Sequence, residues 1–379
     1  MIYLDHNATS PIAPEVRAAM LPALESLFGN PSSIHEAGRL AQNALDEARR
    51  QVAALVNVHA RQVIFTGGGT EANNLALKGV AQREGKGRIL VSSIEHSSIK
   101  GPARDLAAAG FTVEEIPVNP KGRILPGAVK ARLGADVILV SVMLANNETG
   151  VLQDVAEISR YVREAGAVMH TDAAQAAGRI PLDFRATGAQ LMTLSAHKMY
   201  GPKGVGALIT DGSVDLVPQI SGGGQEADRR AGTENLAGIL GFGAAAALAN
   251  ANQPQRAGHV CALRDRLEES LVIRPGITIF GREAERLPNT CQFAIAGMDG
   301  ETVQMGLDRQ GIAVSTGSAC HSKSTEPSHV LLAMGVEPSI AHGAVRVSFG
   351  ASNTQADVDA LLAALDGLSR TLPTGAVGW

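Results

Sequence analysis

The chain has 379 residues, of which 45% are hydrophobic and 18% are charged. This composition is that of a globular protein, and the length favours about two domains. The formal net charge is -4 and there is no long run of Lys and Arg, which argues against nucleic acid as a main partner.

The N-terminal residues and the apolar windows of the sequence predict where the protein is located. Residues 1–6 lack a basic stretch followed by an apolar one, so we expect no secretory signal and a cytoplasmic protein. The most apolar window, residues 238–249, is shorter than the roughly 20 residues that span a membrane, and we interpret it as a buried helix.

The three cysteines, Cys261, Cys291 and Cys320, are odd in number and widely spaced, which opposes a disulfide framework and a CxxC metal site.

Strands and helices alternate along the first two thirds of the chain. Short apolar runs predict strands over residues 63–65, 88–92, 135–142, 167–170, 189–194 and 204–210. Helical patterns begin at residue 70 and after residue 96, and a third covers residues 155–164. This alternation indicates an α/β fold with a mostly parallel sheet, in which ligands bind at the carboxyl ends of the strands.

A change of composition at residues 250–255 separates two helical stretches and marks the predicted domain boundary. We predict a large domain over residues 14–252 and a smaller α+β domain made of residues 1–13 and 253–379. The smaller domain is expected to contain strands over residues 277–280, 290–294 and 344–349, and helices over residues 302–310 and 355–369. Its small polar residues from about 315 to about 327 predict a mobile loop, and the tail after residue 371 is expected to fray.

Three polar side chains follow predicted strands. Lys198 could act as a Schiff-base nucleophile if its pKa fell below the usual ~10.4, although most lysines in such turns are surface residues. Asp172 could keep a pyridine nitrogen protonated, as a pyridoxal ring requires, or it could cap a helix. His96 could stack on a flat cofactor ring, cap the next helix or pack in the core. Taken one at a time, the structural roles are the commoner ones.

Residues 67–71, with the sequence Gly-Gly-Gly-Thr-Glu, join a predicted strand to a predicted helix. A helix N-terminus offers free N–H groups and the positive end of the helix dipole, so it can bind phosphate. The stretch also fits the GxGxxA pattern of dinucleotide-binding proteins, with Glu84 near the position of a ribose-binding acid. This motif by itself therefore leaves a nicotinamide-dependent dehydrogenase open.

Two further side chains lie in polar loops. Asn147, after the strongest predicted strand, could bond to a cofactor or substrate, and Cys320 has His321 beside it to favour the thiolate. The sequence around Cys320 contains no further ligands for a stable metal site. Cys320 could still act as a transient ligand of an iron–sulfur cluster. A lysine, a strand-end acid, a histidine and a glycine-led phosphate loop together make up a pyridoxal-phosphate pocket, whereas a dehydrogenase leaves Lys198 and Cys320 unexplained.

These motifs resemble those of the class I cysteine desulfurases, the NifS/IscS-like group of the class-V aminotransferase family, almost from end to end. The resemblance covers residues 3–9, 29–35 and 230–235, and is most specific in the Ser-Ala-His-Lys segment ending at Lys198 and the Gly-Ser-Ala-Cys segment ending at Cys320. It implies a fold-type I, aspartate aminotransferase-like transferase: α/β, with a mostly parallel seven-stranded sheet in the large domain and a smaller α+β domain. It also implies a homodimer with shared active sites.

The resemblance further implies which residues would bind pyridoxal 5'-phosphate. Lys198 would hold it as an internal aldimine, and Asp172 would face the pyridine nitrogen. Gln175 would bond to the ring hydroxyl, and His96 would stack on the ring. The phosphate would be bound by Gly69, Thr70, Ser195 and His197 and by Thr233 of the partner subunit.

For the substrate, the resemblance implies that Asn147 contacts both cofactor and substrate and that Arg346 grips the substrate carboxylate as a bidentate fork. The implied reaction converts L-cysteine into L-alanine. Lys198 would remove the α-proton, His96 would help to move protons, and Cys320 would take the sulfur as a persulfide. A sulfur-acceptor or cluster-scaffold protein would then receive the sulfur for iron–sulfur cluster assembly.

Several alternatives stay open. The short C-terminal tail and the loop around Cys320 favour the nitrogen-fixation pathway slightly over general iron–sulfur assembly or tRNA thiolation. A selenocysteine lyase or another pyridoxal-phosphate enzyme, such as an aminotransferase, would share the pocket, although an aminotransferase has no need of Cys320. A non-catalytic sulfur-relay protein is the remaining alternative.

Overall fold

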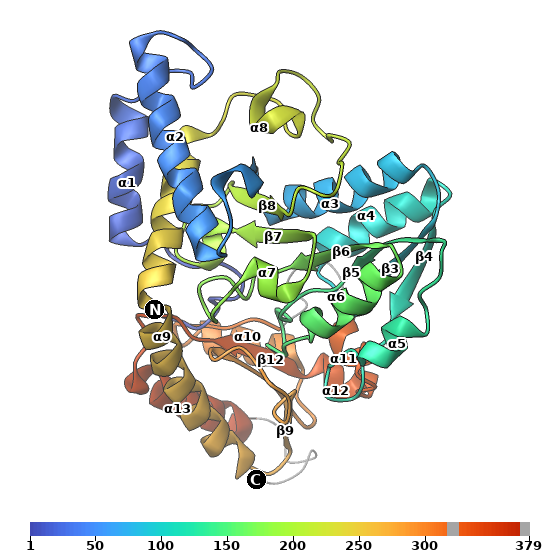
Figure 1. Ribbon diagram of the computed structural model, residues 1–379. Helices are drawn as coiled ribbons and strands as arrows, with labels where there is room; N and C mark the ends of the chain where they lie inside the picture. Colours follow the sequence, from blue (N-terminus) through green and yellow to red (C-terminus); the bar gives the residue numbers. More distant parts are fainter. Residues whose placement is uncertain (317–325, 372–379) are drawn as a thin grey trace.

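The larger of two lobes is built on a seven-stranded sheet in the order β2-β8-β7-β6-β5-β3-β4 (Figure 1). A computed structural model describes residues 1–316 and 326–371, with side chains as far as residue 368. The strands of this sheet are β2 (Val63–Thr66), β3 (Arg88–Ser92), β4 (Thr112–Ile116), β5 (Val137–Ser141), β6 (Val168–Asp172), β7 (Leu191–Ser195) and β8 (Gly206–Thr210). In this sheet β8 runs antiparallel to both neighbours and the other pairs are parallel, so the predicted mostly parallel sheet is confirmed.

Helices cover both faces of this sheet because successive strand residues point to opposite faces. On one face, α3 (Gly69–Glu84) and α4 (Ser97–Ala108) share an apolar core with Leu191 of β7. On the other face, Met192 joins a core with α2 (Glu36–Leu55), α6 (Val155–Glu164) and the first half of α9 (Leu236–Val272). The shorter helices of this lobe are α1 (Pro14–Glu25), α5 (Pro126–Lys130), α7 (Phe184–Thr187) and α8 (Gln225–Asp228).

The strands predicted for this lobe are all present, close to their predicted bounds, and α6 matches the predicted helix over residues 155–164. Strand β4 was not predicted. It lies at the edge of the sheet, and both Glu114 and Glu115 fall within it and are at least partly exposed. Charged residues are common on edge strands because they discourage pairing with other chains, and they hide the apolar alternation that reveals a central strand.

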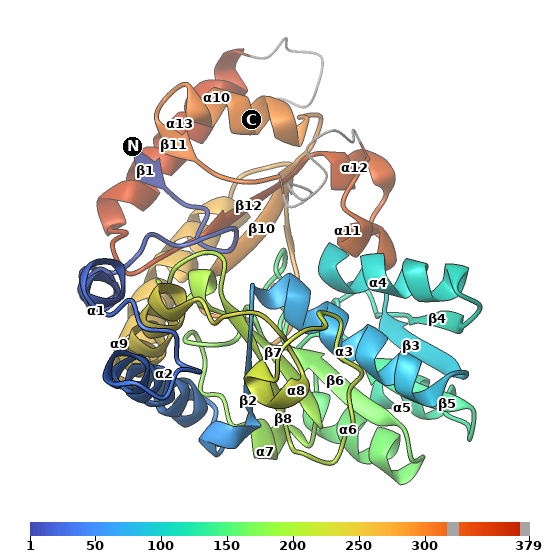
Figure 2. The same ribbon diagram turned by 90° about the horizontal axis from the view of Figure 1, so that it is seen from above.

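The smaller lobe contains the antiparallel sheet β12-β10-β9, made of β9 (Ile277–Phe280), β10 (Thr290–Ile295) and β12 (Ala344–Ser348). The N-terminus belongs to this lobe, because β1 (Ile2–Tyr3) pairs with β11 (Ile312–Ala313), as Figure 2 shows. Its core includes Leu4 together with residues from the sheet and helices. The described helices of the lobe are α10 (Gly300–Asp308), α11 (His329–Ala333), α12 (Pro338–His342), α13 (Gln355–Thr371) and the second half of α9.

Helix α9 corrects one prediction. The sequence predicted a break at residues 250–255, but a single helix of 37 residues continues through Pro254. Proline removes one backbone hydrogen bond from a helix, yet burial on both sides maintains α9 here. Phe242 lies in the core of the larger lobe and Leu267 in the core of the smaller lobe. The helix therefore passes from one lobe to the other near the predicted boundary, and the domain division itself stays a prediction.

A helix that crosses a bilayer needs about 20 predominantly apolar residues. Within the described ranges, no helix combines the length and the apolar composition needed to cross a bilayer.

Candidate functional site

The carboxyl ends of the parallel strands carry the predicted site residues. Asp172 is the last residue of β6, Ser195 is the last of β7, and these two strands are direct neighbours. Lys198 ends the 3-10 turn that follows β7, and Asn147 lies in the turn after β5. Residues from separate parts of the chain therefore meet at one edge of the sheet, where ligands bind in α/β proteins.

Residues 5–10, here called the N-terminal segment, run through the same place. Nζ of Lys198 donates to the main-chain oxygens of Asn7 at 2.6 Å and Ala8 at 2.8 Å. Nε2 of Gln175 donates to the same oxygen of Asn7 at 3.0 Å. The amine and the amide that were predicted to bind a cofactor therefore lie side by side. From the sequence alone this segment was part of a family motif with no assigned place in the site, although its polar composition was a usable signal.

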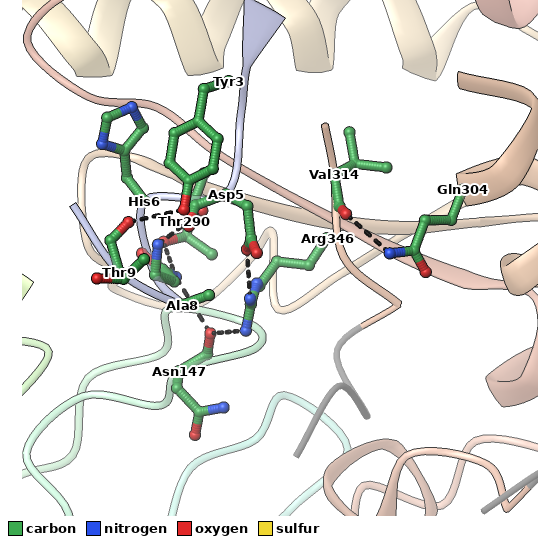
Figure 3. A network of polar contacts seen from close by, with 12 residues as sticks. Tyr3, Asp5, His6, Ala8, Thr9, Asn147, Thr290, Gln304, Val314 and Arg346 are labelled. Atoms are coloured by element: carbon green, nitrogen blue, oxygen red, sulfur yellow. Dashed lines mark hydrogen bonds and ion pairs between the residues drawn. The ribbon is translucent and has the colours of Figure 1, made fainter. Parts of the chain in front are cut away.

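Arg346 on β12 connects the smaller lobe to this cluster, as Figure 3 shows. Its Nη2 lies 2.6 Å from Oδ1 of Asp5, and its Nη1 donates to the main-chain oxygen of Asn147 at 3.0 Å. The side-chain amide of Asn147 points away from Arg346 (Figure 3). Arg346 is buried, and its Nε has no hydrogen-bond partner in the part of the chain that the structure describes. The two predicted substrate residues are thus brought together, and the Nε of the arginine is left for a ligand.

Asp172 is held by an asparagine that the sequence analysis missed. Its Oδ2 accepts from Nδ2 of Asn73 at 2.8 Å, and its Oδ1 accepts from the N–H of Ala174 at 2.9 Å. The same amide of Asn73 donates to Oγ of Ser98 at 2.8 Å. The helix-cap alternative for Asp172 is not what the structure has, because residues 174–179 form turns rather than a helix. Asn73 lies in the middle of α3, where nothing in the sequence pattern marks it.

His96 is the N-cap of α4. Its Nδ1 accepts from the N–H of Ser98 at 3.1 Å and lies 2.8 Å from Oγ of the same serine. The capping alternative is therefore confirmed, and it orients the imidazole ring through one nitrogen. Ser98 also receives the bond from Asn73, so His96 and Asp172 are connected through two intermediate side chains. The stacking role of His96 stays a prediction.

The predicted phosphate residues lie around the start of α3. Helix α3 begins at Gly69 without a side-chain cap, and a Cβ on Gly69 would lie 3.4 Å from Cβ of Ser195. Thr70 is exposed in the first turn of the same helix. Nδ1 of His197 lies 3.2 Å from Oγ1 of Thr9 in the N-terminal segment. Thr233 is exposed on the loop after α8 and makes no hydrogen bond to Gly69, Thr70, Ser195 or His197 within the described chain.

The imidazole of His197 is neutral at physiological pH. Its burial, together with the nearby positive charge of Lys198, lowers the pKa of His197 to about 4. A neutral imidazole can donate or accept a hydrogen bond without adding charge.

Cys320 lies outside the described residues, and its predicted roles as persulfide carrier and part of a mobile loop stay predictions. The described residues on either side of it are close to the site. Ser315 pairs with Arg346 in an antiparallel bridge, its N–H donating to the arginine oxygen at 3.1 Å. Ser315, five residues before Cys320 in the chain, therefore lies beside the predicted carboxylate-binding residue.

A buried glutamate that the sequence analysis also missed lies beside Asn147. Glu148 accepts hydrogen bonds from Nε2 of Gln292 at 3.2 Å and from Oγ of Ser328, the N-cap of α11. Burial raises the pKa of Glu148 above its usual range, although the bond from Ser328 opposes this shift. Glu148 therefore links the turn after β5 to two elements of the smaller lobe.

Glu95, just before His96, is a second buried carboxyl. Its Oε1 accepts from the N–H of Met143 at 2.6 Å, whereas Oε2 has no partner among the residues described. Burial, and secondly the negative charge of Asp172, raise the pKa of Glu95 well above its usual range. The folded protein therefore holds Glu95 in its protonated form at pH values where the unfolded chain has lost that proton.

This shift predicts a pH-dependent gain in stability for Glu95→Gln. Above pH 4.5 the unfolded chain ionises while the folded chain keeps its proton, so wild-type stability falls with rising pH until the raised pKa is reached. Glutamine has the shape of the protonated acid and no proton to lose. The variant should gain up to about 1.4 kcal/mol on the wild type per pH unit, measured by urea unfolding at pH 5 and pH 8. A constant difference at both pH values would contradict the assignment, and Glu84→Gln, at an exposed glutamate, controls for the lost charge.

Over residues 1–316 and 326–371, no group of three or more His, Cys, Asp or Glu side chains is arranged to hold a metal ion.

Comparison with known proteins places these features in a family. Residues 2–361 match the family described as aminotransferase class-V. The chain is 42% identical to a cysteine desulfurase IscS of Dictyoglomus turgidum over 377 residues, which are 98% of this chain and 95% of that protein. It is 44% identical to a cysteine desulfurase of Cereibacter sphaeroides over 383 residues, covering 99% and 98% of the two chains. Among solved structures, a NifS-like protein superposes with a TM-score of 0.92 at 34% identity, covering 98% of this chain and 100% of that chain.

Proposed function

This chain belongs to the class-V aminotransferase family and is a pyridoxal-phosphate-dependent cysteine desulfurase, and from that premise we propose that Cys320 takes the sulfur of L-cysteine as a persulfide while L-alanine is released. The premise rests on 42% and 44% identity over nearly the whole chain. In the proposed step the carbon–sulfur bond of the substrate breaks and a sulfur–sulfur bond to Cys320 forms. We further propose that the sulfur serves iron–sulfur cluster assembly.

The described residues fit pyridoxal phosphate at three points. Helix α3 starts without a side-chain cap, and Gly69 lies against Ser195 without a Cβ, which suits a phosphate group bound by N–H groups. Asp172, oriented by Asn73, offers a carboxylate to the ring nitrogen. Lys198 supplies the amine. When bound, the cofactor withdraws electrons from the α-carbon of the substrate.

The protein's own residues would divide the remaining work. We propose that Nζ of Lys198 holds the cofactor and later takes the α-proton, and that the oxygens of Asn7 and Ala8 bind its ammonium form. Asp172 would keep the ring nitrogen protonated. Arg346 would bind the carboxylate of the substrate and so fix the position of the α-carbon relative to Lys198.

One observation carries this proposal: Lys198 from the larger lobe and Arg346 from the smaller lobe converge on the N-terminal segment. An α-amino acid has one amino group and one carboxylate attached to the same carbon. A site for it therefore needs an amine-reactive group and a carboxylate-binding group a short distance apart. The unpartnered Nε of Arg346 supplies a donor for that carboxylate.

The direct test of the proposal is to identify the sulfur carrier. The protein loaded with cofactor is incubated with one equivalent of L-cysteine, the thiols are alkylated, and the peptides are analysed by mass spectrometry. We expect a mass gain of one sulfur atom on the peptide with Cys320, in proportion to the L-alanine formed. Alanine formation from selenocysteine but not from cysteine would instead identify a selenocysteine lyase. A transamination product in place of alanine would identify an aminotransferase.

The partners and the compartment are further proposals. We propose that a sulfur-acceptor or cluster-scaffold protein receives the persulfide and that the enzyme works in the cytoplasm. The choice of nitrogenase maturation over general iron–sulfur assembly stays a prediction.

We also propose a homodimer, and an exposed apolar surface supports it. At the end of α1 and the start of α2, five large apolar side chains are 43% to 92% exposed: Leu21, Leu24, Phe28, Ile34 and Leu40. Apolar side chains gathered on one part of a surface are typical of association sites. A dimer that covers them would be consistent with the shared active sites that the family resemblance implies.

The double variant Phe28→Ser with Ile34→Ser should therefore weaken the dimer, because these are the most exposed of the five, at 84% and 92%. We expect the monomer–dimer dissociation constant to rise at least about tenfold, measured by analytical ultracentrifugation. Ile273→Ser is the matched control, since Ile273 is 80% exposed at the other end of the molecule, just after α9. An unchanged dissociation constant in the double variant would exclude this surface as the interface.

A further inference from the structure

We propose that Asp5 is a positioning residue of the substrate site, whose carboxylate orients the guanidinium of Arg346 to receive the carboxylate of the amino-acid substrate. The inference rests on the proposed function, because it takes the ligand to be an α-amino acid. It concerns a residue of the N-terminal segment that the sequence analysis left without a role.

Main-chain pairing holds Asp5 beside β12. Asp5 forms a parallel bridge with Ser348, and the N–H of Ser348 donates to the oxygen of Leu4 at 2.8 Å. Arg346 lies two residues before Ser348 on the same strand, so its side chain leaves the same face. The backbone thus brings the two side chains together, and because the aspartate side chain is short, little conformational entropy is lost in keeping the pair.

The guanidinium of Arg346 is held at two of its three nitrogens. Asp5 accepts from Nη2 at 2.6 Å, and the main-chain oxygen of Asn147 accepts from Nη1 at 3.0 Å. A planar group that is anchored at two points cannot turn about its bond to the side chain. The direction of the remaining N–H on Nε is therefore fixed as well. That nitrogen is buried and has no acceptor within the described residues, so a ligand oxygen is a suitable partner.

The charges around the N-terminal segment favour an additional anion. Arg179 donates to the main-chain oxygens of His6 at 2.9 Å and Gln175 at 2.8 Å, and it forms no ion pair in the described ranges 1–316 and 326–371. Asp5 partly neutralises the charge of Arg346. The hydrogen bonds of Arg179, by contrast, go to uncharged main-chain and amide oxygens. A substrate carboxylate would therefore enter a region that still carries net positive charge.

The experiment compares two small aminooxy compounds that react with the bound cofactor and differ in a carboxylate. Aminooxyacetate has one and methoxyamine has none. The rate constant of each reaction is measured from the loss of the cofactor absorbance band, in the wild type and in Asp5→Asn. We expect Asp5→Asn to slow aminooxyacetate about tenfold and to leave methoxyamine within about twofold, because only the first needs an oriented Arg346. The KM for L-cysteine should rise by a similar factor, with kcat changed much less.

Several outcomes would overturn the proposal. Equal slowing of both compounds would show that Asp5 supports the cofactor pocket in general, and no slowing of either would show that it has no part in carboxylate binding. Asp5→Glu keeps the charge and should lose less of the preference for aminooxyacetate than Asp5→Asn; an equal or larger loss would count against the proposal. Asp359→Asn removes another Asp–Arg ion pair of the smaller lobe, with Arg266 at 2.6 Å, and should change neither rate.

This test is separate from the test of the proposed function. Both aminooxy compounds require the bound cofactor, and the preference for aminooxyacetate requires Arg346, but neither reaction involves the transfer of sulfur to Cys320. A protein that shows the expected preference and forms no persulfide would retain the role of Asp5 while the sulfur-carrier proposal fails.

Discussion

Replacement of Lys198 by alanine should abolish conversion of L-cysteine to L-alanine, with a loss of roughly ten-thousandfold or more. Lys198 has two proposed roles, as the covalent attachment point of the cofactor and as the base for the α-proton, and no neighbouring side chain can take over both. Its amine lies at the end of β7, bonded to the oxygens of Asn7 and Ala8. The variant should also lose the absorbance band of the attached cofactor.

Two measurements check this result. Reduction with sodium borohydride should fix the cofactor to the wild-type peptide that contains residue 198, and to no peptide of Lys198→Ala. Lys203→Ala is the matched control, because Lys203 is an exposed lysine in the next turn of the chain. It should keep the absorbance band and most of the activity. A Lys198→Ala protein that retained the band would contradict the assignment.

Replacement of Cys320 by alanine should leave the cofactor bound and the absorbance unchanged, while persulfide formation and sulfide release fall at least about a hundredfold. The cofactor residues all lie outside the segment that contains Cys320, so binding of cofactor and substrate should survive. What disappears is the thiolate that attacks the sulfur of the substrate. Sulfide released in the presence of dithiothreitol, and the mass of the alkylated peptides, measure the effect.

The other two cysteines provide the controls. Cys291 is fully buried in β10, and burial raises the pKa of its thiol well above the usual range, so it remains a protonated, poor nucleophile. Burial also raises the pKa of Cys261, which lies near Arg264 and Asp265 on α9. Cys261→Ala and Cys291→Ala should therefore keep full persulfide formation. A persulfide on either residue in place of Cys320 would refute the proposed carrier.

Part of the candidate site could be predicted from the amino-acid order alone. Lys198 and the glycine loop before α3 each follow a buried apolar strand closely in the chain, and Asp172 is the last residue of another. The carboxyl ends of parallel strands meet at one edge of a sheet, so residues just after such strands must lie near each other. The role of Arg346 depended on the family resemblance, because nothing local to β12 points to a carboxylate. The mostly parallel sheet followed from the alternation of strands and helices.

The remaining parts of the site depend on contacts between residues far apart in the chain. Asp5 and Arg346 are 341 residues apart in the chain. Their ion pair exists because β1 pairs with β11 of the smaller lobe, which places Asp5 against β12. Asn73 orients Asp172 from the middle of a helix, across 99 residues. Hydrophobic periodicity within one helix or strand does not reveal such contacts, because each contact depends on how two elements far apart in the chain pack against each other.

Burial and packing also decided features that local sequence patterns got wrong or left open. The composition of residues 250–255, which include Pro254, predicted a break, yet α9 continues because apolar residues on each side of it are buried in different cores. The amino-acid order over short stretches was sufficient to predict strands, turns and the residues that follow them, because hydrophobic periodicity and backbone preferences act over a few residues. The orientation of Arg346, the protonation of Glu95 and the route of the N-terminal segment required the folded chain. Ion pairs and pKa values depend on distances in space and on the exclusion of water, which only tertiary packing sets.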